Sequence, residues 1–172
     1  LDEVRFLMRF NESLLLRRRD DLHERGVRVR FIGRRGGRVP RRVLQRIEET
    51  EALTARNRRM TLTFAFNYGG RAELADAVRA IAEGVRSGRI DPARVDERMI
   101  SRHLYAPDMP DPDLVVRTSG EYRVSNYLLW ESAYSEFVFT DVLWPDFRRE
   151  HLAAAIGEYQ QRERRFGGVE DA

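Results

Sequence analysis

Residues 61–85 read TLTFAFNYGGRAELADAVRAIAEGV, and this segment decides the fold. Its first six residues, Thr61 to Phe66, are β-branched, aromatic and apolar, which predicts a strand. The sequence NYGG that follows is typical of a turn. The apolar residues after the turn recur at helical spacing and are Leu74, Val78, Ile81 and Val85. The segment therefore predicts one strand, one glycine turn and one amphipathic helix.

The same alternation continues on both sides of this unit. Upstream, the pattern predicts a helix over residues 2–25 with Gly26 as its cap, a strand over 27–32 and a helix that begins at Pro40. Downstream, it predicts a helical stretch from Asp91 to Leu104, strands over 114–116 and 136–140, a short helix over 125–133 and a last helix capped by Asp146. Tandem units of this kind indicate an α/β fold with a mostly parallel central sheet flanked by helices. We expect one domain over residues 1–172.

Composition limits the chemistry. The 172 residues are 42% hydrophobic, which suffices for one core. The chain has no cysteine and no lysine, so all 31 basic residues are arginines. Disulfides, thiolate zinc sites, thiol nucleophiles, Schiff bases and a Walker-type phosphate loop are thereby excluded. The lack of cysteine fits a reducing, cytoplasmic compartment, and the short apolar runs predict no membrane span but leave a peripheral membrane contact open.

Arginine runs raise the alternative of nucleic-acid binding. The net charge is only +3, however, and the run Arg17 to Arg19 is followed at helical distances by Asp20, Asp21 and Glu24. We interpret this run as a solvated helix face, and nucleic acid is not expected as a partner.

A dense polar cluster follows the strand over 114–116. Arg117 and Arg123 can each bind phosphate oxygens in a forked geometry, Ser125 and its neighbours Thr118 and Ser119 offer hydroxyl groups, and Gly120 allows close approach of a backbone. Ligands of an open parallel sheet bind at the carboxyl ends of its strands. The cluster therefore predicts a phosphate or diphosphate site.

Two carboxylates near this cluster have open roles. Glu121 either forms an ion pair with Arg123 or has a magnesium-binding or hydrogen-bonding role. Glu136 precedes the apolar Phe137 to Phe139 and is either a solvated edge residue or a metal ligand. The three histidines have no spacing that suits a metal.

The sequence also resembles a known family, and the resemblance covers nearly the whole chain. The motifs that carry it are NYGGR at 67–71, PDLVVRTSGE at 112–121, RVSN at 123–126, LW at 129–130, AYSE at 133–136, FT at 139–140, LWPDF at 143–147 and RERRFGG at 162–168. In this order they closely resemble the cis-prenyltransferases, which include undecaprenyl and decaprenyl diphosphate synthases.

The resemblance implies a transferase that condenses isopentenyl diphosphate with an allylic diphosphate, such as farnesyl or geranyl diphosphate, into a Z-polyprenyl diphosphate. It implies Mg²⁺ as cofactor and a long hydrophobic groove. The apolar faces of the first two helices, with Phe6, Leu7, Phe10 and Leu14, are the candidate lining, and the alternative is that these are simply core residues. The implied substrate-binding residues are Arg117, Arg123, Ser125, Asn67, Arg165 and Gly167, of which the last two would complete the site of the other subunit in a homodimer. Glu121 and Glu136 are the implied catalytic carboxylates, and Glu136 is the implied metal ligand.

The sequence departs from the family at its start. The His-x-Met-Asp-Gly-Asn loop, whose aspartate engages magnesium, is absent, and we expect that an amino-terminal segment is missing from the chain. An alternative is a non-catalytic partner subunit of such an enzyme. Retention of Arg117, Arg123, Ser125 and Glu136 argues against that alternative.

Overall fold

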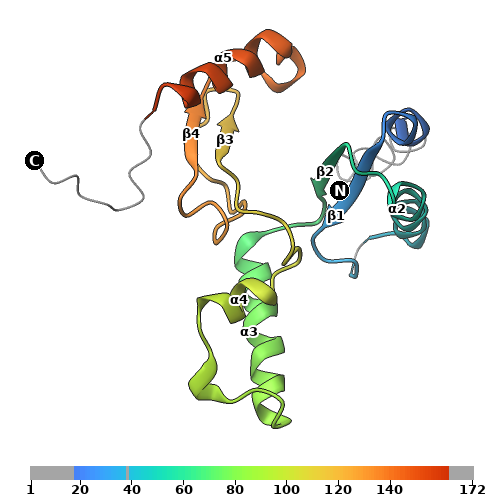
Figure 1. The fold of residues 1–172 in the computed structure, drawn as a ribbon, viewed down its shortest axis with the longest axis vertical. Coiled ribbons are helices and arrows are strands. Elements are labelled where there is room, and N and C mark those ends of the chain that lie inside the picture. Colours follow the sequence, from blue (N-terminus) through green and yellow to red (C-terminus); the bar gives the residue numbers. More distant parts are fainter. Residues whose placement is uncertain (1–17, 38, 163–172) are drawn as a thin grey trace, which may run out of the picture. The chain divides into compact units, whose positions relative to one another are not determined.

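A computed structural model describes residues 18–37 and 39–162 (Figure 1). The expected helix over 2–25 is observed for residues 18–24, and the candidate groove residues Phe6, Leu7, Phe10 and Leu14 lie outside the described residues. The chain divides into two compact units, Leu1–Tyr68 and Gly69–Ala172, which we describe separately. The expectation of one domain with one sheet stays a prediction.

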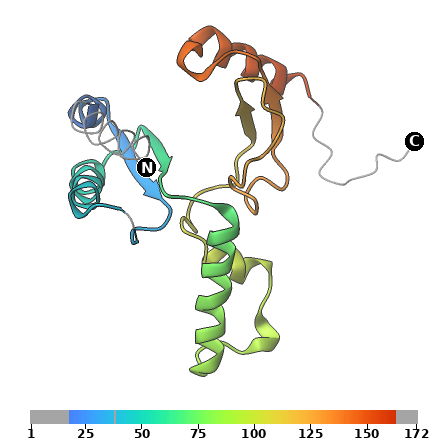
Figure 2. The ribbon, with the colours of Figure 1, turned by 180° about the vertical axis from the view of Figure 1, so that it is seen from behind.

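The first unit contains strand β1 (Val27–Ile32), helix α2 (Arg41–Thr54) and strand β2 (Met60–Ala65). The strands β1 and β2 are parallel, in a register that pairs Val27 with Met60 and Ile32 with Ala65 (Figure 2). Gly26 has φ +73° and ends the preceding helix, as the sequence predicted. A parallel pair needs a crossover helix, and α2 provides it.

Side chains of α2 cover the second edge of β1. The backbone N–H of Val29 donates to Oγ1 of Thr54 at 3.0 Å, and that of Phe31 donates to Oε1 of Glu51 at 2.9 Å. Arg35 binds both carboxylate oxygens of Glu51 at 2.7 Å. These bonds satisfy donors that β2 cannot reach, because β2 pairs with the other edge.

The second unit begins with helix α3 (Gly70–Arg86) and helix α4 (Glu97–Arg102), with a short 3₁₀ turn η1 (Pro92–Arg94) between them. The helices α3 and α4 lie side by side (Figure 1). Buried Glu73 of α3 accepts through Oε1 from the N–H of Tyr105, three residues after α4, at 2.8 Å. The helical stretch expected from Asp91 to Leu104 is interrupted. The side chain of Asp91 caps η1, and that of Asp96 caps α4.

Strands β3 (Leu114–Arg117) and β4 (Glu136–Phe139) form the parallel pair of the second unit, and helix α5 (Arg149–Gln160) packs against both strands. The register pairs Leu114 with Glu136 and Arg117 with Phe139. Both pairs in the described residues are parallel, which confirms the predicted α/β class.

Two further local predictions were wrong. Residues 125–133 form turns instead of a helix. Ser125, Asn126 and Leu128 have φ of +53°, +60° and +43°, and left-handed residues cannot continue a right-handed helix. Asp146 does not cap the last helix, because it lies in the 3₁₀ turn η2 (Trp144–Asp146) and Arg148 is the cap residue.

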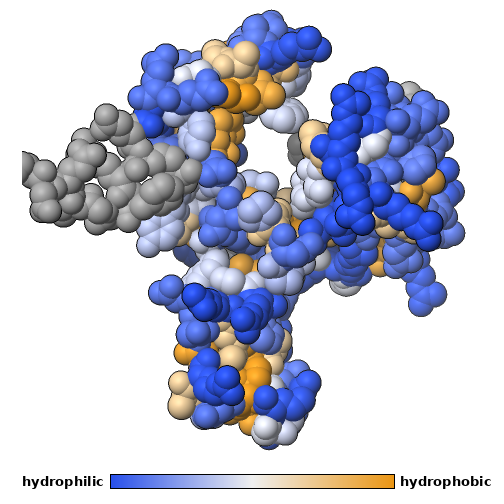
Figure 3. All heavy atoms as spheres, viewed as in Figure 1, coloured by the Kyte–Doolittle hydropathy of each residue, from blue (hydrophilic) through white to orange (hydrophobic). Residues whose placement is uncertain are grey.

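Hydrophobic side chains reach the surface around β4 and α5 (Figure 3). Among the described residues, no helix is long and apolar enough to cross a membrane.

Candidate diphosphate-binding site

Arg117 ends β3 and is the best-placed anion ligand of the second unit. Its carbonyl accepts from the N–H of Thr140 at 2.9 Å, which fixes its backbone to the chain just after β4. Its Nη2 donates to Oγ of Ser125 at 3.2 Å. Its Nε is buried and has no hydrogen-bond partner within the described part of the chain. A buried cationic donor without an acceptor is costly, so this atom is suited to receive an anionic oxygen.

The loop after Arg117 is held in an unusual backbone conformation. Ser119 and Gly120 have φ of +67° and +63°. The N–H of Ser119 donates to the carbonyl of Val142 at 2.9 Å, and that of Gly120 to the carbonyl of Thr140 at 3.1 Å. A non-glycine residue held at positive φ, as Ser119 is here, is frequent at functional sites.

Arg123 lies near Arg117, on the far side of this loop. Both arginines line a cavity of about 130 Å³ together with apolar residues that include Val116, Tyr127 and Phe137. Arg123 also forms an ion pair with Glu121. Its side chain remains 68% exposed, so this pair leaves most of the guanidinium accessible. Of the two roles that the sequence left open for Glu121, the ion pair is thus present.

Asn126 anchors the other end of the loop to α3. Its carbonyl accepts from the N–H of Gly70 and its Oδ1 accepts from the N–H of Arg71, both at 2.8 Å. Gly69 and Gly70 make this contact possible: a Cβ on Gly70 would lie 2.8 Å from Cγ of Leu129. Two otherwise unpaired donors of the first helical turn are thereby satisfied. Sequence reasoning assigned no role to Asn126, although its place beside Ser125 in the RVSN motif was a usable signal.

Glu136 lies apart from the arginine cluster. It begins β4, opposite Leu114, whereas Arg117 ends β3, so roughly 10 Å of strand separates the two positions. Its Oε2 accepts from Nη1 of Arg162 at 2.8 Å. The hydrogen bonds of Glu136 and Glu158 to Arg162 raise the pKa of the Arg162 guanidinium. Glu136 is therefore the acceptor of a fixed cation.

The remaining predicted ligands lie outside the described residues of the second unit. Asn67 belongs to the first unit, where it has φ +50° and its Nδ2 donates to the carbonyl of Arg34 at 2.8 Å. Arg165 and Gly167 lie outside the described residues. Within the described part of the chain, no three His, Asp or Glu side chains form a metal-binding group.

The first unit holds an apolar cavity of about 430 Å³. Its walls come from the helix over 18–24, from α2 and from both strands, and include Leu22, Val29, Phe31, Val43, Ile47, Leu62 and Phe64. Helix α2 therefore contributes Val43 and Ile47 to the wall of this cavity.

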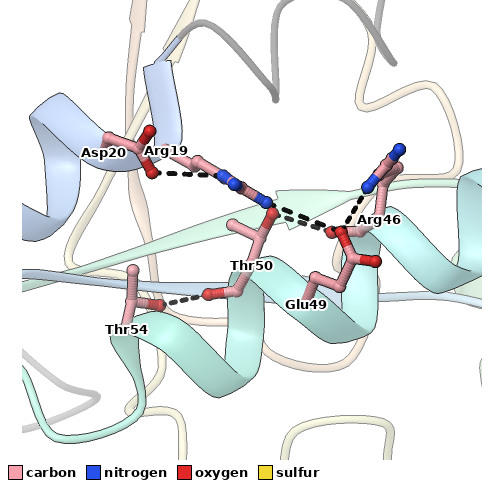
Figure 4. A network of polar contacts seen from close by, with 6 residues as sticks. All are labelled: Arg19, Asp20, Arg46, Glu49, Thr50 and Thr54. Atoms are coloured by element: carbon pink, nitrogen blue, oxygen red, sulfur yellow. Dashed lines mark hydrogen bonds and ion pairs between the residues drawn. The ribbon is translucent and has the colours of Figure 1, made fainter.

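Polar contacts fix the helix over 18–24 beside α2. Arg19, which also lines the cavity, contacts Asp20 at 3.1 Å and Oε2 of Glu49 at 3.5 Å, and Arg46 contacts the same oxygen at 2.6 Å (Figure 4). The hydrogen bond from Arg46, with the charge of Arg46 and Arg19, lowers the pKa of Glu49. Arg19 thus belongs to a structural ion-pair network.

Comparison with known proteins gives the class. The family model described as "Putative undecaprenyl diphosphate synthase" matches residues 1–167. The chain therefore belongs to the undecaprenyl diphosphate synthase family, that is, the cis-prenyltransferases.

Individual relatives agree with this assignment. The chain is 56% identical over 169 residues to the trans,polycis-polyprenyl diphosphate synthase ((2Z,6E)-farnesyl diphosphate specific) of Thermobifida fusca (strain YX), covering 98% of this chain and 60% of the relative. It is 50% identical over 169 residues to the decaprenyl diphosphate synthase of Mycobacterium leprae (strain TN), covering 98% and 57%. The chain thus spans about 60% of the length of these relatives.

A solved structure confirms the fold. Lavandulyl diphosphate synthase from Lavandula x intermedia, in complex with dimethylallyl diphosphate, matches with a TM-score of 0.92 and 36% identity over 96% of this chain and 71% of that chain.

Proposed function

We propose that the protein containing this chain condenses isopentenyl diphosphate with an allylic diphosphate to form a Z-polyprenyl diphosphate, with release of the allylic diphosphate group and a proton. The observation that carries the proposal is the cluster of Arg117, Arg123 and Ser125. Two guanidinium groups line one small cavity, a hydroxyl group lies 3.2 Å from one of them, and the buried Nε of Arg117 lacks an acceptor among the described residues. This donor set suits a diphosphate.

The arginines would act mainly by positioning. Bound diphosphate oxygens would hold isopentenyl diphosphate in one orientation, so that its alkene stays near the allylic carbon while the new bond forms. Arg117 is suited to this role because β3, Thr140 and Ser125 fix it. Arg123, which is mostly exposed, would close on the diphosphate and exchange its ion pair with Glu121 for the substrate.

The hydrocarbon chain would occupy the apolar cavity of the first unit. A volume of about 430 Å³ lined by aliphatic and aromatic side chains favours a prenyl chain over a polar ligand. For the length of the product, the relatives named above offer two examples, a decaprenyl and a polyprenyl diphosphate synthase.

Magnesium is part of the proposal. Glu136 would hold it together with diphosphate oxygens and water. Mg²⁺ is commonly bound in this way, by only one or two protein carboxylates. When bound, the ion would neutralise the charge that develops on the diphosphate as it leaves the allylic substrate. The single carboxylate of Glu136, paired with Arg162, fits the ion only in this mode.

A homodimer completes the proposal, with Arg165 and Gly167 as the residues that would reach the other subunit. The alternative of a non-catalytic partner subunit makes the opposite prediction for Arg123: its replacement by alanine would leave turnover of the assembled enzyme unchanged.

The test is to incubate the intact protein, produced from its whole reading frame, with farnesyl diphosphate, labelled isopentenyl diphosphate and Mg²⁺. We expect labelled prenyl products longer than the primer. A folded protein that forms none would overturn the proposal.

A further inference from the structure

Glu131 is a buried carboxyl group to which the site described above gives no role. The residue is only 6% exposed, and its Oε2 has no hydrogen-bond partner among the described residues. Burial of an ionised carboxylate with one oxygen lacking a partner is unfavourable, whereas a neutral carboxylic acid is tolerated. Glu131 therefore requires an explanation.

The charged groups that act on Glu131 are mostly acidic. The charges of Glu73, on α3 and only 2% exposed, and of Asp111, in the segment before β3, both disfavour ionisation of Glu131. On its own turn, the backbone N–H groups of Trp130 and Glu131 favour the ionised form, and Tyr127 lies close enough to be affected by the charge of Glu131. Trp130 and Asp111 line a cavity together with the charged residues of α4, which are Glu97, Arg98 and Arg102.

The turn that carries Glu131 also connects the arginine cluster to α3. Asn126, five residues before Glu131, accepts both hydrogen bonds from the first turn of α3, and Leu129 packs on Gly70. Ser132, one residue after Glu131, bonds through its N–H and its hydroxyl to the carbonyl of Leu128. Repulsion between Glu131 and Glu73 would therefore act directly on the contact between the turn and α3.

We propose that Glu131 is a positioning residue that keeps the turn over residues 126–132 docked on α3 while it is protonated, and that its ionisation against Glu73 loosens this contact and, with it, the adjoining Ser125 and Arg117. The effect on Ser125 and Arg117 rests on the proposed function, because it assumes the diphosphate site. The docking of the turn on α3 does not depend on that site.

The direction of the pH effect follows from the surroundings of Glu131. Burial, with the charges of Glu73 and Asp111, raises the pKa of Glu131 above its ordinary value. A carboxyl group with a raised pKa in the folded state contributes stability that is fully present below the unfolded pKa and is lost as the pH rises through the folded pKa. Glu131→Gln, which keeps the shape of the neutral acid, should abolish this loss.

The first experiment compares unfolding midpoints of the wild type, Glu131→Gln and the control Glu83→Gln between about pH 4 and about pH 8. Glu83 is an exposed carboxylate of α3, so its replacement removes the same charge from the surface. We expect Glu131→Gln to match the wild type at low pH and to exceed it increasingly as the pH rises, while Glu83→Gln follows the wild type. Parallel curves for the wild type and Glu131→Gln would overturn the proposal.

The second experiment measures amide hydrogen exchange at Gly70 and Arg71, the donors to Asn126. At about pH 8 we expect several-fold slower exchange in Glu131→Gln than in the wild type, and equal rates near the low end of the pH range. Equal rates at every pH would contradict the link between Glu131 and the turn.

The third experiment measures binding of inorganic diphosphate to both proteins. Titration of the ligand itself affects both proteins equally and cancels in the ratio of their dissociation constants. As the pH rises, we expect the dissociation constant of the wild type to increase several-fold relative to that of Glu131→Gln. Binding with a constant ratio would refute the link to the cluster while supporting the site. A pH-dependent difference in amide exchange without any diphosphate binding would support the docking role and count against the proposed function.

Discussion

Arg162 donates from Nη1 to Oε2 of Glu136 at 2.8 Å, so the carboxylate that begins β4 is held by a cation from the residues that follow α5. Glu158 also contacts Arg162. Arg162 therefore joins the proposed metal ligand to the carboxyl-terminal part of the chain.

Replacement of Arg162 by methionine tests what this ion pair does. If Glu136 holds Mg²⁺, loss of the competing guanidinium should lower the Mg²⁺ concentration for half-maximal prenyl transfer several-fold. Both side chains are about a third exposed, so the ion pair should contribute little to stability. Arg149→Met, on an exposed arginine of α5, is the control. An unchanged or higher Mg²⁺ requirement in Arg162→Met would count against the metal role of Glu136.

Thr54→Val tests how α2 covers the edge of β1. The substitution keeps the shape of the side chain but leaves the buried N–H of Val29 without an acceptor, which should reduce the free energy of unfolding by about 1–3 kcal/mol. Urea unfolding measures the loss. Thr61→Val, at an exposed position of β2, should change little. Equal effects of the two substitutions would contradict this explanation of the edge.

Gly33→Ala tests the close approach of β1 and β2 at their carboxyl ends. Gly33 has φ +121°, and an added Cβ would lie 2.1 Å from the carbonyl oxygen of Phe66. We expect destabilisation by more than about 1 kcal/mol. Gly36→Ala meets no atom within 4 Å and serves as the control. A fully stable Gly33→Ala protein, judged by its thermal midpoint, would show that this backbone contact is absent.

Asn126→Ala tests the anchor of the loop on α3. Loss of the Oδ1 acceptor for Arg71 should cost about 1–2 kcal/mol, as at other helix starts, and should also weaken binding of isopentenyl diphosphate because Ser125 adjoins Asn126. Asn126→Gly is the matched variant, since it lacks the acceptor but tolerates the φ of +60°. If both variants bind isopentenyl diphosphate like the wild type, the anchor does not position the site.

Much of the fold could be predicted from local patterns. The alternation of strand and helix, the capping role of Gly26 and the strand that leads to Arg117 follow from periodicity and turn residues. The turns over 125–133 could not, because the apolar YLLW run is typical of a helix, whereas three left-handed residues, fixed partly by contact with α3, determine its actual path. The cap of α5 was misplaced for a related reason, since Trp144–Asp146 forms its own 3₁₀ turn.

The candidate site was predictable only in part. Arg117, Arg123 and Ser125 are near one another in the sequence, and a single loop brings them together. The distance of Glu136 from Arg117 depends on strand register, and its pairing with Arg162 depends on how α5 packs. The burial of Glu131 is likewise a tertiary property, because it depends on the contact of its turn with α3.

The central claim is that Arg117 binds the diphosphate of isopentenyl diphosphate. The most direct measurement is the KM for isopentenyl diphosphate in Arg117→Ala of the intact protein, with Arg94→Ala, an exposed arginine outside the cluster, as control. Loss of a charge-assisted hydrogen bond predicts an increase of about 10- to 100-fold in Arg117→Ala, with an unchanged thermal midpoint and no effect in Arg94→Ala. A wild-type KM in a folded Arg117→Ala protein would contradict the account.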